Sequence, residues 1–190
     1  MAMDTIDKVS AKLEVTLTFL EMFNRPANLM LNSPHGTKTS LIRAFEPTVS
    51  FYRYLYNTVG EPWLWWERRT LSDDQLSELI KDENVEIYVL YFDGVPAGYA
   101  ELDRRDSETI DLAYLGLIPD FIGSKLGPYL LSSVIDIAWS YEPKRLTVNT
   151  CTLDHPKALG LYQKCGFSVY DQNTKTIDHP RFNNISQLVT

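Results

Sequence analysis

Three apolar runs separated by short polar turns lie in the middle of the chain and constrain its fold most. They are Val85–Phe92, Pro96–Asp103 and Thr109–Ile118. Each run has the length of a β-strand, and the Asp93-Gly94 dipeptide between the first two favours the tight turn of a hairpin. Residues 104–108 (RRDSE) supply a second polar turn. The centre of the sequence therefore predicts an antiparallel meander.

Helical and extended segments alternate after the meander. Apolar residues recur on one broad face between Ser124 and Tyr141, which predicts an amphipathic helix that Pro143 ends. The elements expected next are a strand at Arg145–Thr150, a short helix at Pro156–Lys164 and a strand that begins at Phe167–Tyr170.

The segment before the meander adds elements of both kinds. Residues 13–22 alternate apolar and polar side chains with the period of a strand. The other predictions are a strand at Thr39–Phe45, a helix from Glu46-Pro47 to about Asn57, and a helix capped by Ser72 that ends near Lys81. The pattern predicts one α/β domain over residues 1–190, with its core at about 39–172. We expect a mixed, mostly antiparallel sheet with helices on both faces.

Composition and charge narrow the functional classes. The 190 residues carry a formal net charge of −7, which disfavours binding to nucleic acid or to an anionic membrane. Cys151 and Cys165 are too few for a disulfide framework, and the cysteines and histidines do not have the spacing of a metal site. The sequence has neither a secretory signal nor an apolar stretch that spans a bilayer. We therefore expect a cytoplasmic protein without a metal.

The segment from Leu115 to Leu131 has the pattern of a phosphate site. A strand ends, a loop containing Gly123 and Gly127 follows, and the amphipathic helix begins. A helix N-terminus offers unpaired N–H groups and the positive end of its dipole to a pyrophosphate. Lys125 can add a charge contact. By itself the pattern is weak, because glycines before a helix more often serve as turn and cap residues.

A second segment, residues 154–167 (DHPKALGLYQKCGF), strengthens this interpretation. Together the two segments resemble the GCN5-related N-acetyltransferase (GNAT) superfamily, whose patterns are V-x-P-x-x-R-G-x-G-x-G and N-x-x-A-x-x-L-Y-x-x-x-G-F. The matching residues are Leu117, Pro119, Gly123 and Gly127 in the first, and Ala158, Leu161, Tyr162, Gly166 and Phe167 in the second. The resemblance covers about residues 85–170. The departures are Ile122 for Arg or Gln, Lys125 for Gly, and Asp154 for Asn.

The resemblance implies acetyl-coenzyme A as cosubstrate and a splayed strand pair. The strand ending near Leu117 would diverge from the strand at Arg145–Thr150 and admit the pantetheine arm. The N–H of Leu117 would polarise the thioester carbonyl. The residues implied to bind the coenzyme are Leu115, Leu117, Ile118, Gly123, Ser124, Lys125, Leu126, Gly127, Pro128 and Asp154.

Acetyl transfer needs an acid and a base. Tyr162 matches the family's tyrosine, which protonates the departing thiolate; the alternative is that it only packs under the coenzyme. Glu101, in a central strand beside Tyr99, is the first candidate base, because partial burial makes a carboxylate a better proton acceptor. Asp111 is the second candidate. The alternative is that both carboxylates are solvated or paired with Arg104 or Arg105.

Three aromatic residues are candidates for binding the acceptor amine. Trp63 and Trp66 lie where the superfamily has its variable acceptor region, and Tyr99 shares a strand face with Glu101. Aromatic faces can hold an organic cation; the alternative is that tryptophans such as Trp65 fasten helices to the sheet.

The sequence does not identify the amine, which belongs to a small molecule or a protein. It also leaves open a homodimer paired through an N-terminal strand edge. A non-catalytic acyl-coenzyme A sensor of the same fold is the alternative function. A nucleotide site is disfavoured, because neither G-x-x-x-x-G-K-[ST] nor G-x-G-x-x-G occurs.

Overall fold

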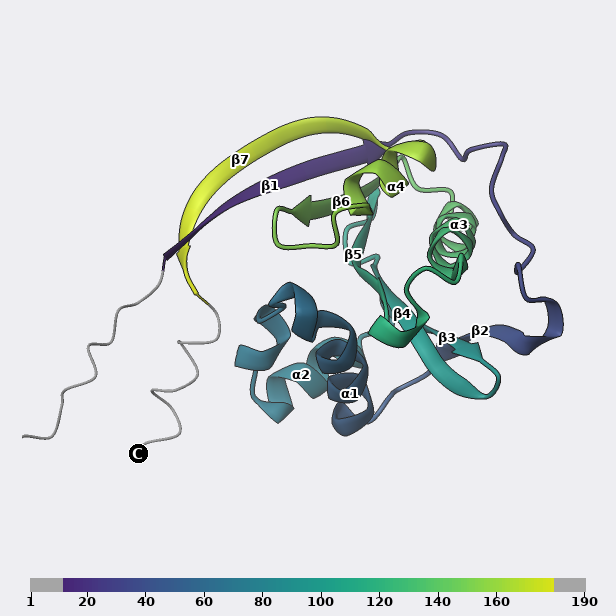
Figure 1. Ribbon diagram of the computed structural model, residues 1–190, viewed down its shortest axis with the longest axis horizontal. Coiled ribbons are helices and arrows are strands. Elements are labelled where there is room, and N and C mark those ends of the chain that lie inside the picture. The colour runs from purple at the N-terminus through teal and green to yellow at the C-terminus, as the bar shows by residue number, and fades with distance from the viewer. Residues whose placement is uncertain (1–11, 180–190) are drawn as a thin grey trace, which may run out of the picture.

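The computed structural model describes residues 12–179, which form a seven-stranded sheet with helices on both faces (Figure 1). The outermost parts of the predicted domain, 1–11 and 180–190, lie outside the described residues. Across the sheet the strands follow the order β2-β3-β4-β5-β6-β1-β7. Their bounds are β1 Lys12–Met22, β2 Thr39–Ala44, β3 Val85–Phe92, β4 Val95–Asp103, β5 Thr109–Leu117, β6 Arg145–Cys151 and β7 Ser168–Asp178. All neighbours are antiparallel except β5 and β6, so the predicted fold class is confirmed.

Helices and short 3₁₀ segments connect these strands. The helices are α1 Val49–Gly60, α2 Asp73–Ile80, α3 Leu126–Trp139 and α4 Ala158–Lys164; the 3₁₀ segments are η1 Gly36–Lys38, η2 Glu61–Trp63, η3 Glu67–Thr70 and η4 Pro119–Phe121. Ser72 caps α2 as predicted, in a complete capping box with Gln75. The first helix starts later than predicted because the hydroxyl of Thr48 accepts the N–H of Phe51, which makes Thr48 the N-cap.

The predicted meander is present as β3, β4 and β5. Asp93 and Gly94 have φ angles of 48° and 86°, and positive φ at both central residues is what a type I′ hairpin turn requires. A register shift between Glu101 and Leu102 follows on the β4–β5 side, and Glu101 lies opposite Tyr114. The Asp93-Gly94 turn thus places β3 and β4 side by side as a hairpin.

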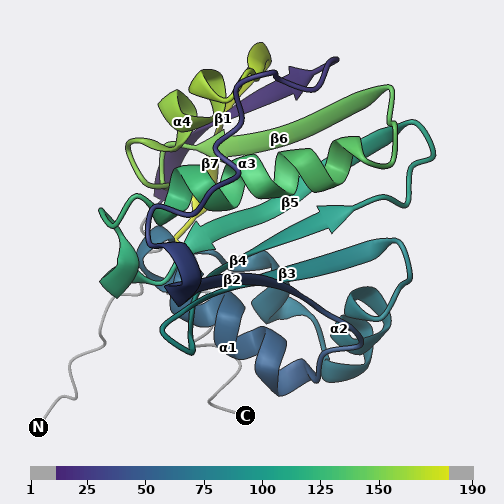
Figure 2. The same ribbon diagram turned by 90° about the vertical axis from the view of Figure 1, so that its right-hand side faces the viewer.

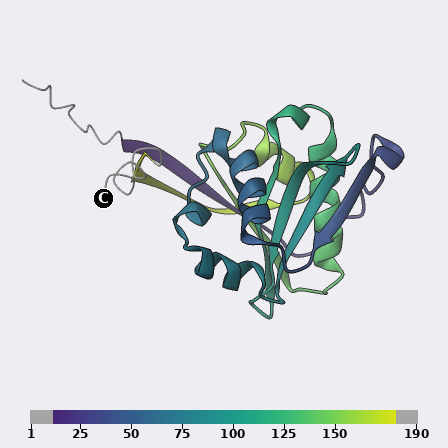
Figure 3. The same cartoon turned by 90° about the horizontal axis from the view of Figure 1, so that it is seen from below.

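Two apolar cores lie on opposite faces of the sheet. On one face α3 packs through Leu126, Leu130 and Val134, and Tyr162 of α4 joins the same core (Figure 2). On the other face the second core collects Tyr52 and Leu55 of α1 with residues of α2 (Figure 3). The sheet is therefore covered on both sides, as predicted.

The parallel contact between β5 and β6 is short. It runs from Thr109 opposite Arg145 to Leu112 opposite Val148, although both strands continue beyond that point. On the far side of β6, the first part of β1 pairs with β7 alone. This two-stranded ribbon (Lys12–Thr16 with Thr174–Asp178) arches beyond the end of β6 (Figure 1). The predicted divergence of the two parallel strands is confirmed.

Several features are defined for the described residues alone. Within residues 12–179, no helix is long and apolar enough to cross a membrane. The same range contains no group of three or more His, Cys, Asp or Glu side chains that could hold a metal ion. Cys151 and Cys165 are both free thiols.

We expect substitution by alanine to have opposite effects on stability at two glycines, Gly98 and Gly160. A Cβ on Gly98 in β4 would lie 2.5 Å from the carbonyl oxygen of Gly116 in β5, whereas a Cβ on Gly160 in α4 would meet nothing within 4 Å. We expect Gly98→Ala to lower the free energy of unfolding by about 1–3 kcal/mol. We expect Gly160→Ala to raise it by about 0.5–1 kcal/mol, since alanine is the better helix former. Urea denaturation measures both, and a Gly98→Ala variant of unchanged stability would contradict the close approach of β4 and β5.

Candidate functional site

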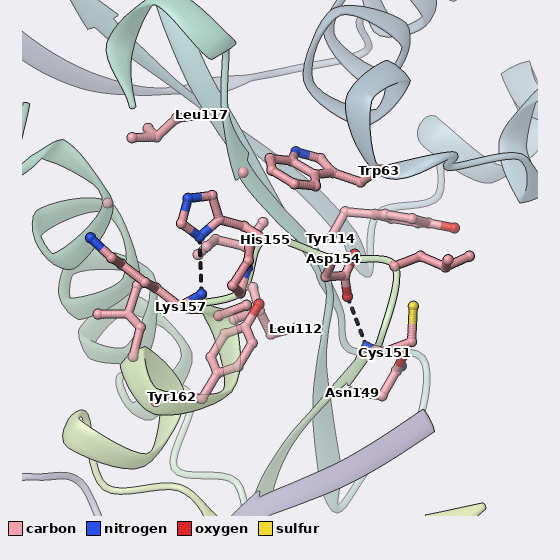
Figure 4. A pocket seen from close by; sticks show the side chains of 18 of the residues that line it. Trp63, Leu112, Tyr114, Leu117, Asn149, Cys151, Asp154, His155, Lys157 and Tyr162 are labelled. Atoms are coloured by element: carbon pink, nitrogen blue, oxygen red, sulfur yellow. Dashed lines mark hydrogen bonds between the residues drawn. The ribbon is translucent and has the colours of Figure 1, made fainter. Parts of the chain in front are cut away.

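A cavity of about 960 Å³ opens where β5 and β6 diverge. Its walls come from the end of β5, the start of α3, the turn between β6 and α4, the connection between α1 and α2, and the ribbon. Figure 4 shows Tyr162 and His155 on one side, with Trp63 and Tyr114 across from them. The volume is typical of a ligand pocket. Segments far apart in the sequence therefore meet at one site.

The edge of β5 that β6 leaves forms one wall. The N–H of Ile118 donates to the carbonyl of Ala97 at 2.9 Å, on the β4 side. Because successive N–H groups along a strand point to alternate edges, the N–H of Leu117 points to the opposite edge, where Leu117 lines the cavity. The N–H of Leu115 faces the same way. Beyond Leu112, β5 therefore offers a strand edge to an extended ligand.

The loop before α3 contains two residues with left-handed φ angles. They are Gly123, with φ 89°, and Lys125, with φ 65°, which is the N-cap of α3. Ser124 between them is held by two hydrogen bonds: its hydroxyl donates to the carbonyl of Phe121 at 2.5 Å, and its carbonyl accepts from Nε2 of His35 at 2.8 Å. Since Lys125 and Gly127 line the cavity, the positive end of the α3 dipole faces it.

Most of the predicted coenzyme-binding residues line the cavity, namely Leu115, Leu117, Gly123, Lys125, Gly127, Pro128 and Asp154. Three do not line it with their side chains, and the backbone contacts to the coenzyme that the resemblance implies for this segment stay a prediction. Leu126 is fully buried in the core under α3, and Ile118 belongs to the second core and spends its N–H on Ala97. Ser124 holds the loop through the hydrogen bonds described above.

Asp154 is fixed by donors on both carboxylate oxygens. Oδ1 accepts from the indole N–H of Trp65 at 3.2 Å, and Oδ2 accepts from the hydroxyl of Thr150 at 2.8 Å and the N–H of Cys151 at 2.9 Å. These bonds join the turn after β6 to the connection after α1. Counting three residues back from Ala158 in N-x-x-A leads to His155, so Asp154 does not stand at the asparagine position.

His155 is a cavity residue that the sequence reasoning did not select. Its Nδ1 accepts the backbone N–H of Lys157 at 3.1 Å, so the neutral ring carries its proton on Nε2. The ring stands edge-on to Trp63, with centroids 5.2 Å apart (Figure 4). His155 therefore presents a hydrogen-bond donor at the cavity, and its place in the N-x-x-A pattern was the signal that could have found it.

Tyr162 lies in α4 and lines the cavity with its hydroxyl directed inward (Figure 4). Its ring packs edge-on against Phe167, with centroids 6.0 Å apart. Burial, with the nearby carboxylates of Asp154 and Asp111, raises the pKa of Tyr162. The phenol therefore keeps its proton near neutral pH and is available as a hydrogen-bond or proton donor.

Glu101 is not among the residues that line the cavity. It is fully buried between α1 and the α1–α2 connection, where the hydroxyl of Tyr52 donates to it at 2.5 Å and Nη2 of Arg68 at 2.6 Å. Both of its oxygens are thus engaged by protein donors. The predicted alternative partners were wrong as well, since Arg104 pairs with Glu86 and Arg105 with Asp103.

Asp111 faces a separate hollow near Asp103 and Arg105, at the opposite end of β5. Its Oδ1 accepts the hydroxyl of Thr147 at 2.7 Å. Burial raises the pKa of Asp111, the Thr147 hydrogen bond opposes that rise, and the nearby carboxylates of Asp103 and Glu101 add to it. Neither predicted base is therefore brought to the cavity.

The predicted acceptor residues are divided by the fold. Trp63 and Trp66 line the cavity, and Trp66 is 41% exposed. Tyr99 is fully buried in the second core, where its hydroxyl has no hydrogen-bond partner among the described residues. Trp65 has the fastening role left open by the sequence, since its ring packs on Tyr56 and Tyr114 with centroids 5.5 and 5.1 Å away.

Glu67 is another cavity residue to which the sequence reasoning gave no role of its own. It lies beside Trp66 at the start of η3, and its Oε2 accepts the hydroxyl of Tyr114 at 2.6 Å. Its neighbour Arg68 points instead into the protein. Nothing in the local sequence distinguishes the two directions, because the segment WWERR has no regular period.

Comparison with known proteins identifies the family. The sequence model described as the acetyltransferase (GNAT) family matches residues 52–167. That range contains β5, β6, the α3 loop and the α4 tyrosine, whereas the ribbon of β1 and β7 lies outside it. A search of curated protein sequences finds no match to this chain.

Solved structures share the fold at low sequence identity. An aminoglycoside N-acetyltransferase in complex with coenzyme A aligns over 73% of this chain and 93% of its own, with 18% identity and a TM-score of 0.54. A GNAT family acetyltransferase from Elizabethkingia anophelis with acetyl-coenzyme A bound aligns over 71% of this chain and 79% of its own, with 21% identity and a TM-score of 0.52. A tandem GNAT protein from the clavulanic acid biosynthesis pathway aligns over 86% of this chain, with 16% identity and a TM-score of 0.58. This chain spans only 53% of the tandem protein's length.

The raised pKa of Asp111 predicts a pH-dependent stability. Because burial raises its folded pKa above the ordinary value of 3.8, folding favours the protonated acid, and that contribution is lost as pH rises through the folded pKa. We expect Asp111→Asn, which can still accept the Thr147 hydroxyl, to be more stable than the parent at pH 7 and to lose that advantage towards pH 4. Urea unfolding at both pH values tests this, with the exposed Asp120→Asn as the control for loss of one carboxylate. A difference in stability between Asp111→Asn and the parent that grows towards low pH would contradict the raised pKa of Asp111.

Proposed function

Because the chain belongs to the acetyltransferase (GNAT) family, we propose that it transfers the acetyl group of acetyl-coenzyme A directly to a primary amine. The observation that carries the proposal is the cavity at the divergence of β5 and β6, which joins a free strand edge to a helix N-terminus. A pantetheine arm has amides that pair with a strand edge, and a pyrophosphate suits a helix N-terminus. The two features occur in the order in which coenzyme A carries these groups.

The backbone supplies the coenzyme seat. The arm would lie along Leu115–Leu117, and the pyrophosphate would meet the loop from Gly123 to Pro128. The ammonium of Lys125 would add a charge contact there. Ile122 lines this end of the cavity and is 40% exposed. Because its side chain is apolar, it offers no charge to the phosphates.

The chemistry needs three groups at the thioester. The amine, having given its ammonium proton to water, attacks the carbonyl carbon as the neutral base; the new N–C bond forms and the C–S bond breaks. The nitrogen then releases a second proton through water as the amide forms, and this proton restores the phenol that protonates the thiolate. The N–H of Leu117 would stabilise the negative charge that develops on the carbonyl oxygen. The phenol of Tyr162 would give its proton to the departing thiolate, which yields coenzyme A.

A thermal melt tests the coenzyme. We expect acetyl-coenzyme A at 100 times its dissociation constant to add about 2.7 kcal/mol of stability and to raise the melting temperature. ATP and NAD are the comparison ligands. A matched variant is Gly127→Asp, which is compatible with the first turn of α3 but brings a negative charge to the phosphate seat, and we expect it to melt normally without a ligand-induced shift. No shift of the parent protein, or an equal shift with ATP, would overturn the coenzyme assignment.

Turnover tests the role of Tyr162 as the acid. We expect Tyr162→Phe to lower kcat about 100-fold, because general acid catalysis contributes at least that much, while its acetyl-coenzyme A melt shift stays unchanged. Release of free thiol measures the rate, and Tyr54→Phe on an exposed part of α1 is the matched control. A coenzyme-induced melt shift combined with no thiol release from any amine would favour the non-catalytic sensor.

A further inference from the structure

We propose that the acceptor is a primary amine with a single positive charge on a flat apolar body, bound between the α1–α2 connection and the ribbon. In this arrangement Glu67 holds the ammonium, and Trp63 and Trp66 contact the body. The inference rests on the proposed acetyl transfer and adds to it the class of acceptor and the residues that select it. The proposed acceptor site is formed by side chains, whereas the proposed coenzyme site is formed mainly by backbone groups.

Glu67 and Asp154 are the carboxylates that line the cavity. Both oxygens of Asp154 already accept hydrogen bonds from Trp65, Thr150 and Cys151. Glu67 accepts one, from Tyr114 to Oε2. Since a carboxylate offers about four acceptor positions on two oxygens, Glu67 has room for the donors of an ammonium. It is the carboxylate best placed for a cationic acceptor.

The neighbouring arginine does not neutralise Glu67. Arg68 directs its guanidinium into the protein, where Nη2 contacts Glu101 at 2.6 Å and Nε contacts the hydroxyl of Tyr52 at 3.3 Å. The guanidinium also lies over the ring of Tyr114, 4.9 Å from its centroid. Glu101 is therefore a positioning residue. By pairing with Arg68 it keeps the guanidinium away from Glu67 and over the ring of Tyr114, whose hydroxyl orients the Glu67 carboxylate.

Tyr114 keeps its hydroxyl directed at Glu67. Burial, with the nearby Tyr56 and Glu67, raises the pKa of Tyr114, so its phenol stays protonated and remains a donor. Its ring is fixed by edge and tilted contacts to Tyr56 and Trp65, with centroids 5.2 and 5.1 Å away. The carboxylate is thus oriented before a ligand arrives, and Figure 4 shows Tyr114 next to Trp63 on the same side of the cavity.

The walls around Glu67 are aromatic and apolar. Trp63 and Trp66 of the same connection line the cavity, as do Val15 and Ile177 of the ribbon. Indole faces attract an organic cation and bury an apolar body. Lys175 of the ribbon also lines the cavity. Among the residues that the structure describes, one cavity carboxylate with free acceptor positions suits a single positive charge, and it opposes polyamines and aminoglycosides, whose further ammonium groups would lack a counter-charge.

Steady-state kinetics with two probes tests the acceptor class. Thiol release from acetyl-coenzyme A is measured with 2-phenylethylamine and with spermidine, on the parent protein and on Glu67→Gln, Tyr114→Phe and Glu78→Gln. We expect kcat/KM for 2-phenylethylamine to exceed that for spermidine by at least about tenfold, and Glu67→Gln to raise KM for the arylalkylamine about 10- to 100-fold, as expected for a lost charge-assisted hydrogen bond. Tyr114→Phe should raise KM less. The exposed carboxylate change Glu78→Gln in α2 should leave both constants unchanged.

A binding measurement separates this inference from the proposed function. Calorimetric titration of 2-phenylethylamine into the coenzyme A complex reads amine binding without turnover, and the acetyl-coenzyme A melt shift reads the coenzyme. The inference is overturned if the melt shift is normal but spermidine is the better acceptor, or if Glu67→Gln keeps the parental KM. Either outcome leaves the proposed acetyl transfer in place. Absence of the melt shift overturns the proposed function itself. Weaker calorimetric binding in Glu67→Gln with an unchanged melt shift supports the inference.

Discussion

The strands β5 and β6 pair over four residue pairs, from Thr109 and Arg145 to Leu112 and Val148, and then separate. A separation inside a sheet leaves backbone N–H and C=O groups without a ladder partner, which is costly unless water or a ligand meets them. The fold tolerates it because each strand is held by its outer neighbour, β5 by β4 as far as Leu117 and β6 by β1 as far as Cys151. The gap therefore stays open without loosening the sheet. An extended ligand with amides of its own, such as the proposed pantetheine arm, would complete the hydrogen bonds that the missing strand pair would have made.

A buried charge fixes the wall across from this gap. Taking the carboxylate of Glu101 out of water is expensive, and the side chain is only 1% exposed in its pair with Arg68. The pair is stable because both oxygens of Glu101 accept protein hydrogen bonds. It fastens the connection after α1 to β4, and the bond from Trp65 to Asp154 fastens the same connection to the turn after β6. Residues between and beside these attachments, such as Trp66 and Glu67, are therefore presented on a rigid support although they lie in irregular structure. Removing one partner would leave the other charge buried and unpaired, at a cost of about 3–5 kcal/mol.

Much of the fold could be predicted from interactions between residues that are close in the sequence. The period of the central strands, the Asp93-Gly94 turn and the Ser72 cap each depend on neighbours in sequence, and each was predictable. The glycine-containing loop before α3 was predictable too, because glycine and a helix start are local signals. Glu101 was assigned to the cavity since strand alternation gives the face of a side chain but not what packs over that face. Its partner Arg68 is 33 residues away and lies in a segment without a regular period. Ile118 and Leu126 show a related limit, because a segment can face a cavity with its backbone while these side chains pack in the core.

The two ends of the cavity thus depend on different parts of the polypeptide. At the coenzyme end the donors are mainly backbone N–H groups, which any residue other than proline supplies. Substitutions such as Ile122 and Lys125 can occur there without removing the strand edge or the helix N-terminus. At the acceptor end the contacts come from the side chains of the α1–α2 connection and the ribbon, and each substitution changes them directly. In the proposed function, backbone geometry would hold the coenzyme, and a few side chains, with Glu67 foremost, would select the amine that reaches it.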